Sequence, residues 1–375
     1  MRLRLTDRRT QAWAVQVASG VILAAIAALV VQTLLANLAR LNLSAGFGFL
    51  ARPAGMQIAE SVVSADASDS FAWVIFAAAL NTVRVAACAV VLATLLGTAV
   101  GTMRLSSNPL LRTITAVYVE LFRNTPLLLQ VIFWAAVMLR LPGVREAINL
   151  GGWIFLSQRG LQMPALAVQD GLLGPVLAAA AACGAVATLA ARRRGPSARL
   201  AAFFVAFVIA GLVALAVQGR LELDRPVRKL LGYSGGMVLT PEFCALLVGL
   251  VAYAGAFIAE IVRGGILAVP QGQWEAARSL GLRDATILRR VVLPQAIRVI
   301  LPPLTSQYVG IIKNSSLAIA IGYPDLFWAI SSAINVTGHA IEGVVLLMLA
   351  YLLLTLSTAG VMNTWYARLL RRGTT

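Results

Sequence analysis

Charged residues are scarce in this chain of 375 residues: only 12% are Asp, Glu, Lys or Arg, while 59% are hydrophobic. Soluble domains carry about 25% charged residues, so this composition excludes that class and indicates an integral membrane protein. The charges present are mostly basic, with 31 Lys and Arg against 15 Asp and Glu. Nucleic-acid-binding proteins share such an excess, so the placement of the charges must decide between the two classes.

Three reactive residue types are also rare. His339 is the single histidine, which excludes a zinc site built from two or more histidines. The two lysines, Lys229 and Lys313, follow no glycine-rich loop, so the chain lacks the phosphate-binding motif of a P-loop ATPase. The three cysteines each lie in an apolar run, as packing residues do. We predict no metal site and no cofactor. A membrane-embedded enzyme is disfavoured because the spans also lack paired carboxylates.

Eight stretches are long and apolar enough to cross a bilayer, which takes about 20 helical residues. We therefore predict an all-α polytopic membrane protein. The first stretch follows several arginines, but its apolar core is too long for a cleaved signal peptide. Gly97 and Gly101 form a small-xxx-small pair suited to close helix packing. The predicted spans are 10–39, 71–103, 113–139, 171–191, 200–219, 243–259, 299–324 and 343–367.

The basic residues are distributed unevenly about these spans. Eight spans put both termini on one side, and if that side is cytoplasmic, most Arg and Lys residues lie in cytoplasmic segments. Basic residues are preferentially retained on the cytoplasmic side during insertion. The basic excess therefore reports membrane topology and not nucleic acid binding, and it places residues 263–298 in the cytoplasm.

The chain divides into four regions of different character. Residues 1–70 hold the N-terminus, the first span and an external loop, and residues 71–140 hold the next two spans. Residues 141–238 combine an outside loop rich in Gly and Gln with two plain Ala- and Val-rich spans, which we expect to be peripheral. Residues 239–375 hold the remaining spans and the cytoplasmic loop 263–298.

The loop 263–298 contains the stretch WEAARSLGLRDATILRRVVLP, which predicts two short helices with a turn between them. Gly281 accepts the backbone conformation that reverses the chain. The second helix has apolar residues on one side and arginines on the other, and we expect Pro294 to end it. Such a loop can dock on a partner protein or lie on lipid headgroups, and the pattern alone does not decide between them.

The spacing of this loop resembles the signature of permease subunits of bacterial ATP-binding-cassette (ABC) importers: Glu-Ala-Ala, three residues, Gly, nine residues, Ile, one residue, Leu-Pro. Val291 stands in place of the isoleucine. The resemblance implies a type I importer core of five helices, here with extra peripheral helices. It also implies that the loop is a coupling helix seated in a groove of an ATPase subunit, whose ATP-driven dimerisation moves the spans. The residues that match are Glu275, Ala276, Ala277, Gly281, Leu293 and Pro294.

Other segments are similar to the polar amino acid uptake branch of this family, and they cover about 71–139 and 240–367. The chain length and residues 335–342 resemble the larger permease of general L-amino acid importers. The implied cargo is polar L-amino acids such as glutamate, glutamine and aspartate. The segments are 118–130, 263–266, 302–308, 313–317 and 321–326.

The resemblance also implies a set of partners in the bacterial inner membrane. These are two copies of an ABC ATPase subunit, a second permease in a heterodimer, a periplasmic amino acid binding protein and membrane lipid. ATP hydrolysis is expected on the separate ATPase subunit, so this chain is not expected to be an enzyme. No nucleic acid partner is expected.

Polar groups at membrane depth are candidates for the translocation path, because a charge there is costly and normally faces a partner or water. On one span, a lysine and neighbouring hydrogen-bond donors can bind the carboxylate of an amino acid. The alternative is that Lys313 pairs with Glu260 or Glu120 and only joins helices. The candidates on this span are Lys313, Asn314, Ser315 and Ser316.

A second group of candidates is Glu120, Arg123 and Thr125. Glu120 and Arg123 are one helical turn apart, so they can pair with each other or face the substrate. Pro126 frees a backbone carbonyl, which suits a moving element. Arg84, on the preceding span, can pair, extend to the interface or contact the ligand.

A competing hypothesis is an ion-coupled secondary amino acid transporter, which also uses broken helices and charges near the membrane midplane. That class requires internal repeats and a coupling carboxylate, and the sequence shows neither convincingly. It also gives the cytoplasmic loop no role, so the ATP-driven importer is favoured.

Overall fold

The computed structural model describes residues 8–40, 46–58, 60–168, 221–229 and 232–371, together with the isolated positions 183 and 186. Within them, three helices are long and apolar enough to cross a membrane, or up to five if each of two bent helix pairs is one span. The predicted membrane protein of apolar helices is confirmed. Apart from positions 183 and 186, the predicted spans 171–191 and 200–219 lie outside the described residues, so the count of eight spans stays a prediction.

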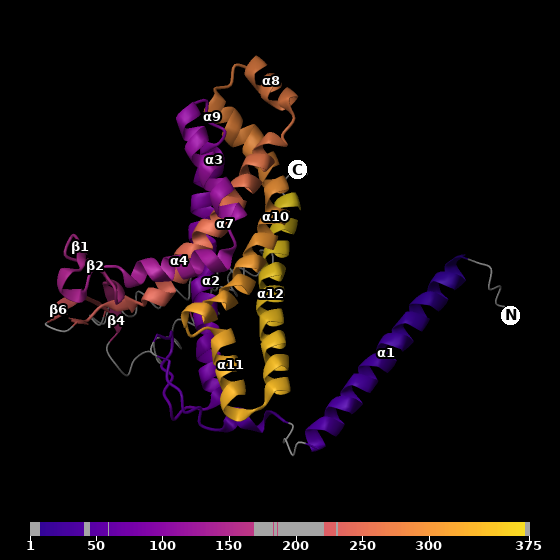
Figure 1. The fold of residues 1–375 in the computed structure, drawn as a ribbon. Coiled ribbons are helices and arrows are strands. Elements are labelled where there is room, and N and C mark those ends of the chain that lie inside the picture. Colours follow the sequence, from indigo (N-terminus) through magenta and orange to yellow (C-terminus); the bar gives the residue numbers. More distant parts are fainter. Residues whose placement is uncertain are drawn as a thin grey trace.

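Three long helices and two bent pairs form a bundle (Figure 1). The long helices are α2 (Phe71–Met103), α7 (Pro241–Leu267) and α12 (Ala340–Arg371). The first bent pair is α3 (Pro109–Asn124) and α4 (Leu127–Leu139). The second comprises α9 (Asp284–Ile287), a π-helical segment η4 (Leu288–Val292), α10 (Leu293–Asn314), a 3-10 segment η5 (Ser315–Ile321) and α11 (Leu326–Thr337). Helix α1 (Arg8–Arg40) is drawn apart from this bundle.

The two ends of the bundle carry different elements. Helix α8 (Gln271–Ser279) and the end of α12 lie at one end, and the loop before α2 lies at the other, beside the turn from α11 to α12 (Figure 1). That loop includes the 3-10 turn η1 (Phe47–Ala51) and is fastened to α12, because the N–H of Gly46 donates to Glu342 Oε1 at 2.8 Å. The polar loop within residues 263–298 and the loop of residues 46–70 therefore lie at opposite ends of the bundle.

Helix α7 packs along α2 at the centre of the bundle. The pair can approach closely because α2 carries Gly97 and Gly101, as the sequence predicted. A Cβ atom added at Gly97 would lie 2.6 Å from Cβ of Ile258 and 2.8 Å from the carbonyl oxygen of Gly255 on α7. The backbone of α7 therefore occupies the space that any larger side chain at Gly97 needs.

We expect Gly97→Ala to destabilise the chain by about 1–3 kcal/mol, because the added methyl group overpacks the contact between α2 and α7. Thermal unfolding in detergent measures the effect. Gly310→Ala on α10 is the matched control, since no atom lies within 4 Å of the Cβ position there. Equal unfolding midpoints for the two variants would contradict the close contact.

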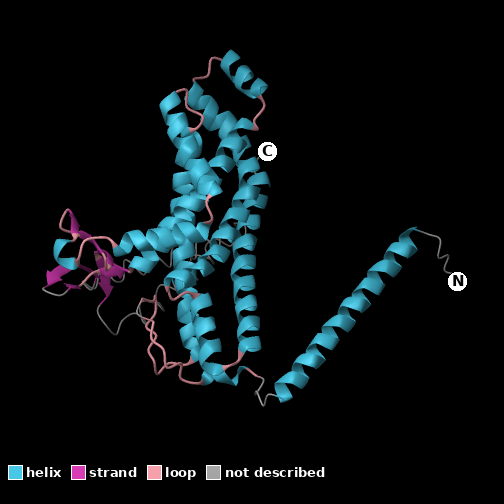
Figure 2. Ribbon diagram, viewed as in Figure 1, coloured by secondary structure: helices cyan, strands magenta, loops and turns pink. Residues whose placement is uncertain are grey.

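A group of short strands lies beyond α4, to one side of the bundle (Figure 2). An antiparallel sheet has the order β1-β2-β3-β8, with a 3-10 turn η2 (Val144–Glu146) before it. Two further pairs are β4–β5 and β6–β7. The strands are β1 (Ile148–Leu150), β2 (Ile154–Ser157), β3 (Gly160–Met163), β4 (Ala165–Val168), β5 (Leu221–Asp224), β6 (Val227–Lys229), β7 (Gly232–Ser234) and β8 (Met237–Leu239).

From the sequence we expected helices alone, and these strands were not predicted. Each has three or four residues, which is too short to display the alternation of apolar and polar residues that identifies a strand. The mostly helical class stands, and the strands add a small β-structured layer to it.

The span predicted as continuous over 113–139 is broken, which corrects that prediction. Helices α3 and α4 meet at 106°, with Thr125 and Pro126 between them. Pro126 has no N–H to continue the α3 hydrogen-bond ladder. The side chain of Gln130 replaces part of that ladder, because its Nε2 donates to the carbonyl oxygens of Phe122 at 3.0 Å and Thr125 at 3.1 Å. Side-chain hydrogen bonds from Gln130 thus stabilise the break.

Candidate coupling surface and translocation path

The polar loop within residues 263–298 folds as two helices with a turn between them, as the sequence predicted. Helix α8 ends at Ser279, and Gly281 adopts the left-handed conformation with φ +73°. The N–H of Gly281 donates to the carbonyl of Arg278 at 2.9 Å, and the N–H of Leu282 donates to the carbonyl of Ala277 at 3.3 Å. These bonds close the end of α8 and direct the chain into α9.

Burial divides the residues of this loop into an inner and an outer face. Ala277 is 4% exposed and belongs to the same buried cluster as Ile287 and Val292, which are fully buried. Ala276 and Glu275 are exposed, and Leu280 is 79% exposed. The inner face fixes α8 to the following helix, whereas the outer face presents small and apolar side chains at one end of the molecule.

Pro294 does not end the second helix, which corrects the prediction made from its sequence position. The helix continues from α9 through η4 into α10, and Pro294 lies in the first turn of α10. The π-helical register of η4 precedes Pro294, and a proline is tolerated where its missing N–H is not needed. Leu293, beside it, is 39% exposed. The loop and the membrane-spanning α10 are therefore one continuous helical element.

Ion pairs join the helices below this loop. Glu260 of α7 pairs with Arg104 at the end of α2, and its Oε1 accepts a hydrogen bond from Arg263 Nε at 3.1 Å. Glu260 was a proposed partner for Lys313, but the structure pairs it with these two arginines instead.

Lys313 and its neighbours lie where α10 gives way to η5. Ser315 is fully buried and its hydroxyl donates to the carbonyl of Ile312 at 2.8 Å, while the Ser316 hydroxyl donates to the carbonyl of Lys313 at 2.7 Å. Asn314 is half-buried. The Lys313 side chain is exposed and forms no ion pair within the part of the chain that the structure describes. Its charge is available to a ligand.

The second group of predicted residues surrounds the break between α3 and α4. The guanidinium of Arg123 lies 5.1 Å from the centre of the Phe257 ring on α7, and Glu120 is exposed. Neither joins an ion pair among the described residues, so the simple pairing of Glu120 with Arg123 is not the arrangement found. Thr125 Oγ1 donates to the carbonyl of Leu121 at 2.9 Å and accepts from Gln130 Nε2 at 2.8 Å.

The two breaks lie close together, because η5 packs against both α4 and α7. Arg123 precedes one break and Lys313 precedes the other. Cations beside interrupted helices can bind an anionic group in the membrane by charge-assisted hydrogen bonds. The segment that follows Lys313 thus packs against the helix that follows Arg123, and a shared role of the two groups stays a prediction.

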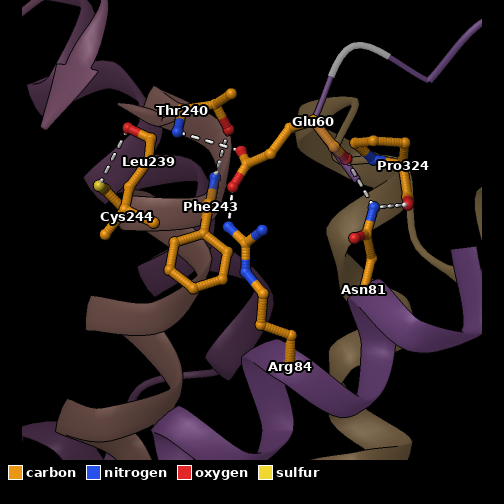
Figure 3. A network of polar contacts seen from close by, with 8 residues as sticks. All are labelled: Glu60, Asn81, Arg84, Leu239, Thr240, Phe243, Cys244 and Pro324. Carbon is orange, nitrogen blue, oxygen red and sulfur yellow. Dashed lines mark hydrogen bonds and ion pairs between the residues drawn. The ribbon is translucent and has the colours of Figure 1, made fainter. Parts of the chain in front are cut away.

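A buried polar network that the sequence did not reveal lies at the end of the bundle opposite α8 (Figure 3). Glu60, which is 8% exposed, pairs with Arg84 of α2 and accepts a hydrogen bond from the N–H of Thr240 at 3.0 Å. The Arg84 guanidinium also lies 4.4 Å from the centre of the Phe243 ring. Arg84 was expected to pair or to extend to the interface, and it pairs.

Asn81 extends this network to the second bent pair. Its Nδ2 donates to the carbonyl of Glu60 at 2.7 Å and to the carbonyl of Pro324 at 3.1 Å, just before α11. Glu60 was missed because it lies in a loop without periodicity, and its partners come from distant segments. A single carboxyl residue therefore joins the loop before α2 to α2 itself and to the start of α7.

Residues 89–372 match the model of a family described as "binding-protein-dependent transport system inner membrane component". The chain is 40% identical to the putative amino-acid ABC transporter permease protein YhdX of Escherichia coli (strain K12), over 98% of this chain and 96% of that protein.

Two further relatives have more specific names. The general L-amino acid transport system permease protein AapQ of Rhizobium johnstonii is 41% identical over 89% of this chain and 86% of its own length. The glutamate/glutamine/aspartate/asparagine transport system permease protein BztB of Rhodobacter capsulatus is 37% identical over 70% of this chain and 71% of its own length. The residues matched by the family model include the predicted coupling loop and both broken helix pairs.

Proposed function

The chain belongs to the family of binding-protein-dependent transport system inner membrane components, and on this premise we propose that it is the permease subunit of an ATP-driven importer of polar L-amino acids. The observation that carries the proposal is the Glu275–Pro294 loop, whose outer face is exposed and whose second helix continues into α10. Relatives named for general L-amino acid and for glutamate and aspartate transport support this cargo.

Coupling to ATP hydrolysis takes place at the outer face of α8. Glu275, Ala276 and Leu280 present this face to an ATPase subunit, and Gly281 sets its direction. Movement of the ATPase displaces α8, whose inner residue Ala277 transmits the displacement to Ile287 and Val292. Because α9, η4 and α10 form one continuous helical element, the displacement reaches Lys313 at the far end of α10.

The translocation path runs past the two helix breaks. Lys313 and Arg123 attract the carboxylate of the amino acid, and Asn314, whose side chain is half-buried, lies beside them. Ser315, Ser316 and Thr125 hold the backbone of the breaks, since their hydroxyls bond to carbonyls of their own helices. Glu120 is exposed on α3 and contributes a negative charge near the entrance of this region.

The complete transporter contains further subunits. We propose two copies of an ATPase subunit, a second and different permease, and a periplasmic binding protein that delivers the amino acid. Both termini face the cytoplasm, together with α8, and the chain itself catalyses no reaction. Residues 1–70 act as an anchor with its external loop, and residues 71–140 form the first part of the core. Residues 141–238 are an inserted region, and residues 239–375 form the second part of the core.

Reconstitution tests the function. The chain, its ATPase and a second permease in liposomes should take up L-glutamate only with ATP and binding protein present, and vanadate should block uptake. An uncoupler should leave this uptake unchanged. Uptake that collapses with the uncoupler alone and ignores vanadate would identify an ion-coupled transporter instead.

We expect Lys313→Met to reduce uptake by roughly 10-fold or more, since a charge-assisted hydrogen bond to the carboxylate contributes about 1.5–3 kcal/mol. The ATPase should still copurify, because α8 lies at the opposite end of α10. Lys313→Arg keeps the charge and should retain most of the uptake. Unchanged uptake by the Met variant would remove Lys313 from the path.

A further inference from the structure

A cavity of about 510 Å³ lies in the β-structured layer, outside the helical bundle. Two basic side chains, a glutamine, a tyrosine and a valine line it, together with the backbone of two glycines. The side chains that line it are Arg159, Gln162, Lys229, Tyr233 and Val238.

Strand register places one wall of this cavity. Gln162 of β3 is opposite Phe155 of β2 and opposite Val238 of β8, so the three side chains share one face of the sheet. The rings of Phe155 and Tyr233 lie 5.1 Å apart, which folds the β6–β7 hairpin over this face. The cavity therefore lies between the sheet and the hairpin and is open to the surface.

Gln162 is the unusual member of this wall. It is 4% exposed, and within the described residues its Oε1 atom has no hydrogen-bond partner. A buried polar atom without a partner is costly, so such an atom is normally satisfied by a ligand or water. A carbonyl oxygen accepts hydrogen bonds, so the missing group is a donor.

Two cations also line the cavity. Lys229 of β6 is exposed and forms no ion pair among the described residues. Arg159 follows β2, and its Nη1 atom would lie 3.6 Å from a Cβ atom added at Gly232, so the guanidinium lies close to the hairpin backbone. Ammonium and guanidinium groups bind carboxylates by charge-assisted hydrogen bonds.

We propose that this cavity binds a small carboxylate that also carries a hydrogen-bond donor, as a free amino acid does. The carboxylate lies against Lys229 and Arg159, and the ammonium group donates to Gln162 Oε1. A simple dianion such as sulfate does not fit, because sulfate has no hydrogen-bond donor to offer the glutamine oxygen. The site is outside the bundle and binds its ligand whether or not the chain transports it.

Hydrogen exchange on the full-length chain in lipid nanodiscs tests this site locally. L-Glutamate should slow exchange in residues 154–163 and 232–239, and glutarate, which lacks the ammonium group, should need roughly 10-fold higher concentration. Lys229→Met should weaken L-glutamate binding by roughly 10-fold. Arg145→Met removes an exposed cation of the same layer that does not line the cavity, and should change nothing.

The Gln162→Leu variant distinguishes a role of Gln162 in ligand binding from a role in stability. It should abolish the preference for L-glutamate over glutarate without lowering the thermal unfolding midpoint, because the buried oxygen has no partner to lose. The proposal is wrong if L-glutamate slows exchange nowhere in these strands, or equally well in Lys229→Met and Gln162→Leu. Protection by sulfate equal to that by L-glutamate would also overturn it.

Discussion

Replacing Ala277 by Arg is expected to reduce ATP-driven uptake to background. Ala277 is 4% exposed, and it packs in the cluster that contains Ile287 and Val292. An arginine side chain cannot fit there, and burying its charge without a partner is strongly unfavourable. The variant therefore separates α8 from the helix that continues into α10, and a docked ATPase can no longer move the bundle.

Uptake into liposomes and copurification with the ATPase measure this effect together. The outer face of α8 is unchanged, so some ATPase should still copurify while uptake is lost. Ala51→Arg is the matched control, because Ala51 is exposed in the loop at the opposite end of the bundle. If Ala277→Arg supports normal uptake, α8 does not act through its buried face.

Arg84→Met should produce a large loss of stability. It leaves the Glu60 carboxylate without its ion-pair partner, although the Glu60 side chain is only 7% exposed. Breaking a buried pair by removing one partner costs about 3–5 kcal/mol. We expect a clear fall in the thermal unfolding midpoint in detergent.

Two further variants identify the cause. Adding Glu60→Gln to Arg84→Met should recover part of the loss, because the stranded charge is gone. Arg278→Met breaks the exposed ion pair between Arg278 and Asp284, in which the two side chains are 60% and 76% exposed. This variant should lower the free energy of unfolding by no more than about 1 kcal/mol. Equal effects from Arg84→Met and Arg278→Met would mean that the Glu60 pair is not effectively buried.

Much of the fold followed from local sequence signals. Apolar length predicted α2, α7 and α12, and the spacing from Glu275 to Gly281 predicted α8 and the turn after it. The glycine pair on α2 predicted the close contact with α7. These features depend on neighbouring residues or on one residue type at a fixed spacing, so a single sequence contains them.

Other features depend on what distant segments supply. Pro294 looked like the end of a helix, but the π-helical turn η4 before it lets the helix continue. The break at Thr125 and Pro126 has an angle of 106° that no local pattern specifies. Glu60 is bound by Arg84 and Thr240, which are distant from it in sequence. Gln162 lines a cavity because β3 pairs with β8, more than 70 residues further along the chain. Sequence position alone did not identify these partners.

The side-chain cap on the α3–α4 break bears on how fast the protein can change shape. Bending an intact helix in lipid ruptures backbone hydrogen bonds, and each exposed group costs several kcal/mol. At this break the Phe122 and Thr125 carbonyls are already bonded to Gln130. The angle between α3 and α4 can therefore change without leaving these two carbonyls unpaired, which removes one free-energy cost of the motion.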